Sequence, residues 1–307
     1  MAVVMVEIQS LTVFNELMRC GSIRQTADAL NVSPTAIARQ LDKLEHLFGT
    51  ALVERNPRGI RLTAAGEVLA ERSLHIAREL SEVEQIIDDL RGLQRGSVSL
   101  YVNGAASSAI LAPALAEFSE RYPAITIEVT VTSAQAALDA VATGLTDLSV
   151  TMFSTADSRI ETRFRAPIRH EAILSPDHPL ARLDEIPLSE LVHYALALPD
   201  RTFGVRRAFD ARLRDAGIVL GESTFTTSSL ELQKELARRG TAVLILPEMT
   251  VKREIGSGSL VMRPLAKSSR IETHLEMNRI ATGQRSYAVR RMSDFLEGFL
   301  RAEFENR

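Results

Sequence analysis

The sequence of 307 residues contains a single cysteine, Cys20, and only six histidines. One cysteine excludes an internal disulfide framework and a cysteine-based zinc site. Its place in an apolar helical pattern is typical of a small buried side chain rather than a reactive thiol. No two histidines have the spacing of a metal-binding pair on a helix, so we expect no metal site and no cofactor.

Long apolar runs and catalytic motifs are missing as well. No uncharged apolar run approaches the roughly 20 residues that cross a bilayer. The apolar start, Met1 to Val6, lacks the basic segment of a signal peptide. We therefore expect a soluble, cytoplasmic protein with no membrane partner. There is no nucleophile elbow, no paired catalytic carboxylates, no P-loop and no GxGxxG after a strand, so we do not expect an enzyme.

The net charge of −3 does not suggest a nucleic-acid partner, so the placement of basic residues matters more than their sum. In the N-terminal region, apolar residues at helical spacing predict a helix that begins near Ile8 and ends at Gly21. The capping-box pattern Ser22–Gln25 predicts a second, short helix. Asn31 suits the left-handed conformation of a tight turn, and Val32 is expected to fill the corner between helices.

A third helix is expected to begin after Ser33, a good N-cap, with Pro34 in the first helical position, and to end at Gly49. Its outer face carries Thr35, Arg39, Gln40 and Lys43. Two helices joined by a short turn, the second with such a face, are typical of a helix-turn-helix, whose second helix enters the major groove. Arginine and glutamine suit bidentate contacts with guanine and adenine.

A short hairpin is expected next, between Leu52 and Leu62, with its turn at Asn56–Gly59. Phosphate contact is the natural role of its basic side chains, which are Arg55, Arg58 and Arg61. One alternative stays open, because any small three-helix unit also has a solvated polar face.

Several motifs in this region fall in a characteristic order. They are Leu11-x-x-Phe14, Gly21-Ser22, Ala27-x-x-Leu30-Asn31-Val32-Ser33, Arg39-Gln40-Leu41-x-x-Leu44-Glu45, Phe48-Gly49, Leu52-x-x-Arg55, Arg58-Gly59 and Leu62-Thr63-x-x-Gly66-Glu67. In these motifs the chain resembles the LysR-type transcriptional regulators. The resemblance implies a winged helix-turn-helix that binds double-stranded DNA. The DNA-contacting residues that it implies are Ser33, Pro34, Thr35, Ala36, Ala38, Arg39, Gln40, Arg55 and Arg58.

The chain departs from the family pattern at two of these positions. Pro34 stands where the family usually has glutamine, and Ala38 where it usually has serine. Both changes remove a polar group that family members direct toward DNA, although the proline ring can touch a thymine methyl. We therefore expect an atypical operator preference.

A long helix is expected to start at Thr63 and to run to about Gly92. Its apolar residues follow the alternating steps of a coiled coil, which favours dimerisation. They are Ile76, Leu80, Val83, Ile87 and Leu90. The alternative is a helix packed on its own domain. Gln94–Gly96 is interpreted as a hinge.

The remaining two-thirds alternates strand and helix patterns, which favours a parallel α/β sheet with ligands bound beyond the carboxyl ends of its strands. The expected strands are Val98–Val102, Ile125–Val131, Asp147–Met152, Ala172–Leu174, Tyr194–Leu198 and Ala242–Leu246. The expected helices are Ala109–Tyr122, Gln135–Thr143, Val205–Ala216 and Leu230–Arg239.

This region resembles the LysR effector domain in short motifs. They are Phe118-x-x-x-Tyr122-Pro123, Gly144-x-x-Asp147, His178-Pro179-Leu180-Ala181, Ala216-Gly217-Ile218 and Leu246-Pro247. The resemblance implies two α/β lobes joined by two crossover strands, as in type 2 periplasmic solute-binding proteins. The implied division is a winged helix-turn-helix at 1–65, a linker and dimerisation helix with hinge at 66–96, and an effector domain at 97–307, with lobe I at 97–164 and 266–307 and lobe II at 165–265.

The cleft between the lobes is the expected effector site. Its candidate contacts are Asn103, Gly104, Ser107, Ser108, Thr132, Ser133, Thr151, Phe203, Thr227 and Ser228. Hydroxyls and amides at helix starts favour a small anion such as a carboxylate. Each serine or threonine can equally be a helix cap, and Ser228–Glu231 has the pattern of a capping box. His178 is interpreted as structural.

The sequence thus predicts a sequence-specific DNA-binding transcriptional regulator of the LysR type, modulated by a small anionic metabolite. A homodimer or homotetramer is expected, with RNA polymerase as a further partner. The alternative is a DNA-binding oligomeric scaffold or regulator with no small-molecule effector. A free-standing solute-binding protein would need export and would carry no DNA-binding module.

Overall fold

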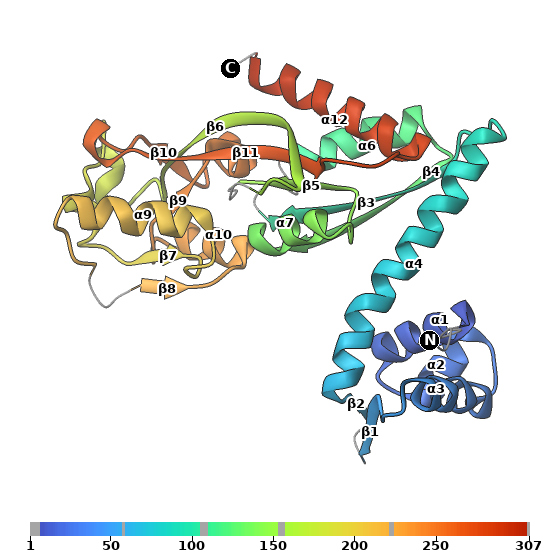
Figure 1. The fold of residues 1–307 in the computed structure, drawn as a ribbon. Helices are drawn as coiled ribbons and strands as arrows, with labels where there is room; N and C mark the ends of the chain where they lie inside the picture. Colours follow the sequence, from blue (N-terminus) through green and yellow to red (C-terminus); the bar gives the residue numbers. More distant parts are fainter. Residues whose placement is uncertain (1–6, 57–58, 105–109, 153–156, 221–223, 306–307) are drawn as a thin grey trace. The chain divides into compact units, whose positions relative to one another are not determined.

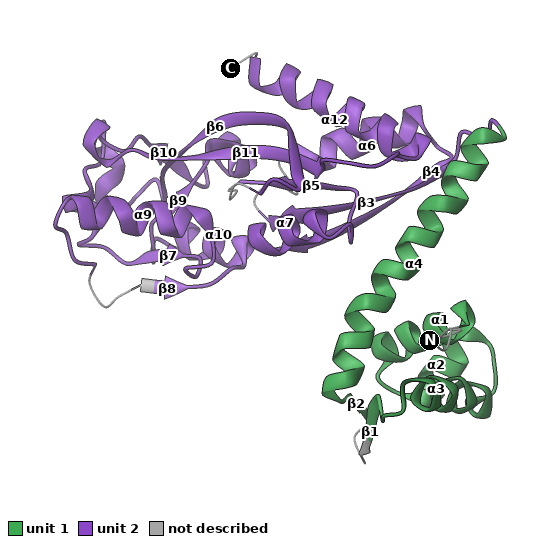
Figure 2. Cartoon of the chain, viewed as in Figure 1, with its two compact units in different colours: residues 1–91 green, residues 92–307 purple. Residues whose placement is uncertain are grey.

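The computed structural model describes residues 7–56, 59–104, 110–152, 157–220 and 224–305. The chain forms two compact units, Met1–Arg91 and Gly92–Arg307 (Figure 2). Among the described residues, no helix combines the length and apolar character needed to cross a bilayer.

The first unit consists of three short helices, a hairpin and a long helix. Its elements are α1 (Ile8–Cys20), α2 (Ile23–Leu30), α3 (Pro34–Phe48), β1 (Val53–Asn56), β2 (Gly59–Leu62) and α4 (Ala64–Leu90). The hairpin strands are antiparallel. One apolar core joins these elements, with Phe14, Leu17 and Ile37 fully buried in it. The predicted winged helix-turn-helix is confirmed.

The ends of the short helices follow local rules that the sequence predicts. Gly21, Asn31 and Gly49 end α1, α2 and α3 with φ angles of 67°, 53° and 66°, in the left-handed region. Ser33 caps α3, because its Oγ accepts a hydrogen bond from the amide of Ala36 at 3.2 Å. Each helix boundary therefore depends on contacts within a few residues.

Two local predictions are wrong. Ser22 precedes α2, but its hydroxyl makes no capping hydrogen bond; its carbonyl oxygen accepts from both the amide and the hydroxyl of Thr26. Val32 does not fill the corner between helices, because it follows the left-handed turn at Asn31 and its side chain is 45% exposed. Ala27 is buried in the core at this end of α2.

The hairpin is attached to its neighbours through its backbone. Glu45 on α3 accepts hydrogen bonds at Oε1 from the amides of Leu52 and Val53, at 2.8 and 3.3 Å. On the other side, an ideal Cβ at Gly66 would lie 2.0 Å from the carbonyl oxygen of Leu52. Thr63 caps α4 as predicted, its Oγ1 accepting from the amide of Gly66 at 3.0 Å. The hairpin and α4 can pack this closely only with glycine at position 66.

The long helix α4 leaves an apolar stripe uncovered. It spans 27 residues, close to the predicted extent. Four members of the predicted stripe are exposed: Ile76 by 45%, Val83 by 51%, Ile87 by 43% and Leu90 by 81%. Because these side chains do not pack on the core of the first unit, they are available to a partner helix.

The second unit is an α/β domain whose elements are β3 (Gly96–Asn103), α6 (Ala112–Arg121), β4 (Ile125–Thr132), α7 (Ala134–Ala142), β5 (Leu148–Thr151), β6 (Ile160–Leu174), η2 (Pro179–Arg182), α8 (Leu188–Leu191), β7 (Leu196–Leu198), α9 (Gly204–Asp215), β8 (Thr224–Thr226), α10 (Leu230–Arg238), β9 (Leu244–Leu246), η3 (Glu248–Thr250), α11 (Lys252–Gly256), β10 (Val261–Arg263), η4 (Lys267–Ser269), β11 (Ile271–Ile280) and α12 (Tyr287–Glu305).

A mixed sheet runs through this unit (Figure 1). Its seven strands have the order β10-β6-β11-β5-β3-β4, with β9 also paired to β6. The strands β3, β4 and β5 are parallel, as predicted. The sheet as a whole is not parallel, because β11 is antiparallel to both β5 and β6. The long strands β6 and β11 carry the chain out of lobe I and back again, so they must run in opposite directions.

Separate apolar cores mark two lobes. In the first, α6 and α12 pack on the sheet around Phe118 and Met292. In the second, Phe209 of α9 lies in its own cluster. The strand β6 contributes to both, with Ile168 in the first core and Leu174 in the second. Since β11 does the same, the predicted two-lobed effector-domain fold with two crossover strands is confirmed.

We expect Gly66→Ala to destabilise the first unit by about 2 kcal/mol, because its Cβ would overlap the carbonyl oxygen of Leu52 and overpacking costs roughly 1–3 kcal/mol. Hydrogen exchange of peptides from α1 to α3 should then accelerate more than about tenfold. Gly298→Ala is the matched control, since this helical glycine has open space around its Cβ position. It should be neutral or slightly stabilising in α12. Unchanged exchange in Gly66→Ala would contradict the packing.

Candidate DNA-binding surface and ligand cavity

The predicted DNA contacts on α3 lie along one part of that helix. The exposed ones are Ser33, Pro34, Thr35 and Arg39, and the half-buried ones are Ala36, Ala38 and Gln40. Arg55 belongs to β1, opposite Ile60 of β2. Arg58 lies outside the described residues. The first turns of α3 therefore present the polar side chains of Ser33, Thr35 and Arg39 to solvent, with Pro34 exposed between them.

Arg39 is the cation of α3 best placed to meet a negatively charged partner. It is exposed, and within the described part of the chain no carboxylate pairs with it. Lys43, one turn later, instead pairs with Glu7 at 3.0 Å. An exposed guanidinium without a protein partner can make bidentate contacts with a base or a phosphate.

Gln40 has a role inside the fold as well as on its surface. The buried hydroxyl of Ser10 donates to its Oε1 at 2.7 Å. This bond fixes the side-chain amide and leaves its nitrogen as the end that a ligand can meet. Gln40 therefore both stabilises the contact between α1 and α3 and presents its amide nitrogen at the surface.

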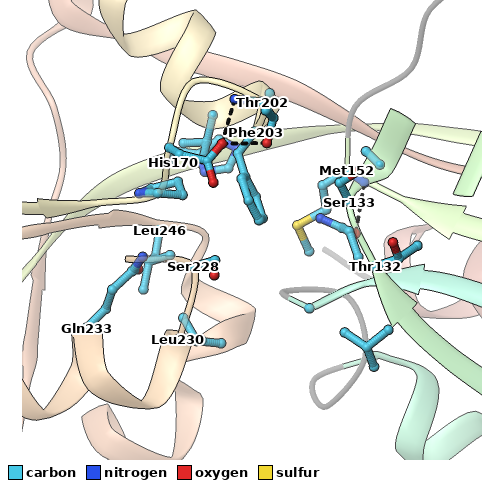
Figure 3. Close-up of a pocket in the computed structure, with 18 residues that line it drawn as sticks. Thr132, Ser133, Met152, His170, Thr202, Phe203, Ser228, Leu230, Gln233 and Leu246 are labelled. Atoms are coloured by element: carbon cyan, nitrogen blue, oxygen red, sulfur yellow. Dashed lines mark hydrogen bonds between the residues drawn. The ribbon is translucent and has the colours of Figure 1, made fainter. Parts of the chain in front are cut away.

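A cavity of about 550 Å³ lies in the second unit, between the two lobes (Figure 3). The ends of β3, β4 and β5 and the N-termini of α7, α9 and α10 border it. In α/β sheets this edge, at the carboxyl ends of parallel strands, is where ligands bind. Its size falls within the range of small-molecule sites.

Six of the predicted effector contacts line this cavity, namely Asn103, Gly104, Thr132, Ser133, Phe203 and Ser228. Thr151 and Thr227 are not among the described lining residues. Ser107 and Ser108 lie outside the described residues. The strands and helix starts expected from the sequence thus bring most of the candidates together.

The two threonines that do not line the cavity lie in a buried strand and at the start of a helix. Thr151 is fully buried in β5, opposite Glu276, and the alternation of side chains along the strand brings Met152 to the cavity instead. Thr227 is used in the start of α10: its Oγ1 accepts from the amide of Ser229, and its carbonyl oxygen accepts from Gln233 at 2.6 Å.

The sequence left open whether the serines at the helix starts cap a helix or contact a ligand, and the structure shows which of them cap and which line the cavity. Ser133 caps α7, accepting from the amide of Ala136 at 3.2 Å, and also lines the cavity. The expected capping box at Ser228 is wrong by one residue, because Ser229 caps α10. The hydroxyl of Ser228 is therefore not used in capping and lies at the cavity wall.

His170 lines the cavity, and the sequence reasoning missed it. It lies on β6, is 3% exposed, and its Nε2 is 2.8 Å from Oγ1 of Thr273 on β11. Its buried Nδ1 has no hydrogen-bond partner among the described residues. The inward alternation of Ala166, Ile168 and His170 along β6 is the signal that could have found it.

Asp200 and Gln233 are two further lining residues that the sequence reasoning missed. Asp200 precedes α9, and its Oδ1 accepts from the amide of Thr202 at 2.8 Å. The hydroxyl of Thr202 donates to the same oxygen at 2.5 Å, and this bond together with the amide bond holds the pKa of Asp200 below its usual value. His178, in contrast, is structural as interpreted, since its Nδ1 accepts from the amide of Leu180.

The burial of His170 predicts a pH dependence of stability. Burial lowers the pKa of His170 from 6.5 to about 3. Between these values the unfolded chain binds a proton that the folded chain does not, so the free energy of unfolding falls by roughly 1 kcal/mol per pH unit as pH drops. We expect His170→Gln to have a shallower slope than the wild type between about pH 6 and pH 4 in denaturant unfolding. Equal slopes would contradict a neutral, buried imidazole.

Two family models match the chain. The model described as "Bacterial regulatory helix-turn-helix protein, lysR family" matches residues 8–67, and the model described as "LysR substrate binding domain" matches residues 91–301. The RuBisCO operon transcriptional regulator of Allochromatium vinosum is 26% identical over 257 residues, which cover 83% of this chain and 84% of that protein. The probable nitrogen assimilation transcriptional activator of Synechococcus elongatus is 27% identical, and the match covers 80% of each chain.

Solved structures share the fold of the chain. Full-length CbnR complexed with its target DNA has a TM-score of 0.72 and 19% identity, over 96% of this chain and 100% of that one. Full-length OxyR from Pseudomonas aeruginosa has a TM-score of 0.69 and 17% identity, over 97% and 95% of the two chains. The family models describe regulators rather than enzymes, so the prediction of a non-enzyme is confirmed. The chain belongs to the LysR family of transcriptional regulators.

Proposed function

We propose that this LysR-family regulator binds specific operator DNA and that a small anionic metabolite in the interlobe cavity modulates its DNA binding or activation. The observation that carries the proposal is the combination in one chain of an exposed Arg39 on α3, with no carboxylate partner among the described residues, and a cavity bordered by helix N-termini. The first supplies base and phosphate contacts. The second supplies amide donors for an anion.

The DNA-contacting set proposed is the one implied by the family motifs: Ser33, Pro34, Thr35, Ala36, Ala38, Arg39, Gln40, Arg55 and Arg58. The exposed start of α3 supports a major-groove position for its members. Pro34 cannot donate a hydrogen bond, and Ala38 has no hydroxyl, so apolar contact with thymine methyls is expected to replace polar readout there.

A homodimer or a dimer of dimers is proposed from the stripe on α4. The exposed apolar side chains from Ile76 to Leu90 suit a coiled-coil partner. A two-fold dimer would present two reading heads to a palindromic site. The working division is then 1–65 for DNA, 66–96 for dimerisation and 97–307 for the effector. We further propose that the regulator contacts RNA polymerase and that it is located in the cytoplasm.

The effector is proposed to act by closing the two lobes. Thr132 and Ser133 lie on one wall of the cavity, and Phe203 and Ser228 lie on the other (Figure 3). A ligand that contacts both walls binds the closed arrangement better than the open one, and this difference in affinity is what shifts the equilibrium. A change in subunit packing would then alter the spacing of the DNA-binding heads.

Gel-shift titration of the full chain on DNA upstream of its own gene tests the proposal. We expect a salt-sensitive shift that is specific for that fragment. Arg39→Ala should weaken the specific complex about tenfold or more, since a bidentate base contact contributes about 1–3 kcal/mol. Arg291→Ala on α12 removes the same charge from an exposed position in the second unit and should leave the affinity nearly unchanged.

The same titration with small carboxylates added separates the two forms of regulator. A specific complex that responds to a carboxylate supports the effector-controlled regulator. A specific complex that no small molecule changes favours the effector-free scaffold. Failure to distinguish the upstream fragment from random DNA at modest salt would overturn sequence-specific binding.

A further inference from the structure

The charges around the cavity restrict what it can bind. Among the described lining residues Asp200 carries the only ionised side chain, and there is no lysine or arginine. His170 does not supply a positive charge, because its buried imidazole is neutral near pH 7. Arg206 acts on the charge of Asp200 but is paired with Asp210 at 2.8 Å and does not line the cavity. A dianion would therefore face Asp200 with no lysine or arginine among the described lining residues.

The lobe I wall is a donor surface. The N-terminus of α7, a helix of nine residues, reaches the cavity at Ser133 and Ala134. Its first amides have no partner within the helix, and the positive end of the helix dipole points the same way. Thr132 adds a hydroxyl beside them. One carboxylate group fits this wall.

The lobe II wall carries side-chain acceptors beside the N-termini of α9 and α10. Oδ1 of Asp200 is engaged by Thr202, which leaves its second carboxylate oxygen for a ligand. Gln233 donates from Nε2 to the carbonyl oxygen of Thr227, so its Oε1 is the end that remains. Figure 3 shows His170, Thr202 and Gln233 on the same side of the cavity, across from Ser133 and Thr132.

The buried Nδ1 of His170 is an independent sign of a ligand. The side chain of His170 is only 3% exposed, yet this nitrogen has no protein partner in the described part of the chain. When Nε2–H donates to Oγ1 of Thr273, Nδ1 is an acceptor. An unmet buried acceptor at a cavity wall costs free energy, which a donor on the ligand would recover. With Asp200 and Gln233 it forms a set of acceptors suited to an ammonium group.

Between these two walls the cavity is apolar. Val131 and Met152 line it from the first lobe, and Phe203, Leu230 and Leu246 line it from the second. We propose, on the basis of the proposed regulator function, that the effector is an apolar α-amino acid or a close relative, with its carboxylate on the start of α7 and its ammonium on Asp200, His170 and Gln233. Because its carboxylate and its ammonium share one α-carbon, such a ligand would draw the two walls together around its charged end, with its side chain among the apolar lining residues.

Matched ligand series test this assignment by calorimetric titration of the full chain. One series is L-phenylalanine, 3-phenylpropionate and 2-phenylethylamine, and the other is L-leucine, 4-methylpentanoate and 3-methylbutylamine. We expect at least one of the two amino acids to bind about tenfold or more tightly than both of its truncated forms, because each truncation leaves one wall unpaired. Succinate, a dianion, should not bind.

Two variants locate the ammonium contact. Asp200→Asn keeps the side-chain acceptor for Thr202 and should weaken amino-acid binding about tenfold while leaving binding of the matched carboxylate unchanged or improved. Asp215→Asn, an exposed carboxylate at the other end of α9, is the charge-matched control and should bind as the wild type does.

Three results would overturn the assignment: a carboxylate or succinate that binds better than the amino acids, an Asp200→Asn variant with wild-type affinity, or no binding by either amino acid. A gel shift with operator DNA, done on the same protein preparation, shows whether only the ligand assignment has failed or the proposed regulator function as well. If specific DNA binding persists while the amino acids do not bind, the ligand class is wrong and the regulator stands.

Discussion

The antiparallel pairing of β6 with β11 is the constraint on which the ligand cavity depends. The pairing runs from Ile271 opposite His170 to Ile280 opposite Ile160, so one ribbon passes from the second core to the first. It also brings His170 within hydrogen-bond distance of Thr273, and thereby fixes an imidazole at the cavity wall. Since each lobe has its own core, this ribbon links the two lobes that border the cavity.

Features that depend on neighbours in the chain could be predicted from the sequence. Gly21, Asn31 and Gly49 end helices, and Ser33 and Thr63 begin them, because each acts on backbone groups within four residues. Family motifs extended this to the winged helix-turn-helix and to the two-lobed domain. The convergence of Asn103, Thr132 and Ser133 at one cavity followed from strand–helix alternation, since parallel strands end at the same edge.

Features that depend on distant partners could not be predicted in this way. The full length of β6 and its pairing with β11 join residues far apart in the chain, so a local pattern found only Ala172–Leu174. His170 and Asp200 were missed because the cavity that they line is built from elements far apart in the chain, which no local spacing encodes. Thr151 has a hydroxyl suited to a ligand contact, but its side chain is fully buried in the fold.

The central claim, that the chain reads specific DNA sequences through α3, is tested most directly by mixing the purified chain with fragmented genomic DNA and sequencing what it retains. We expect enrichment at discrete sites, each with two symmetric half-sites separated by about one helical turn or a multiple of it, because two helix-turn-helix heads of a dimer read successive major grooves. Even coverage of the genome, with no enriched sites at near-physiological salt, would contradict it.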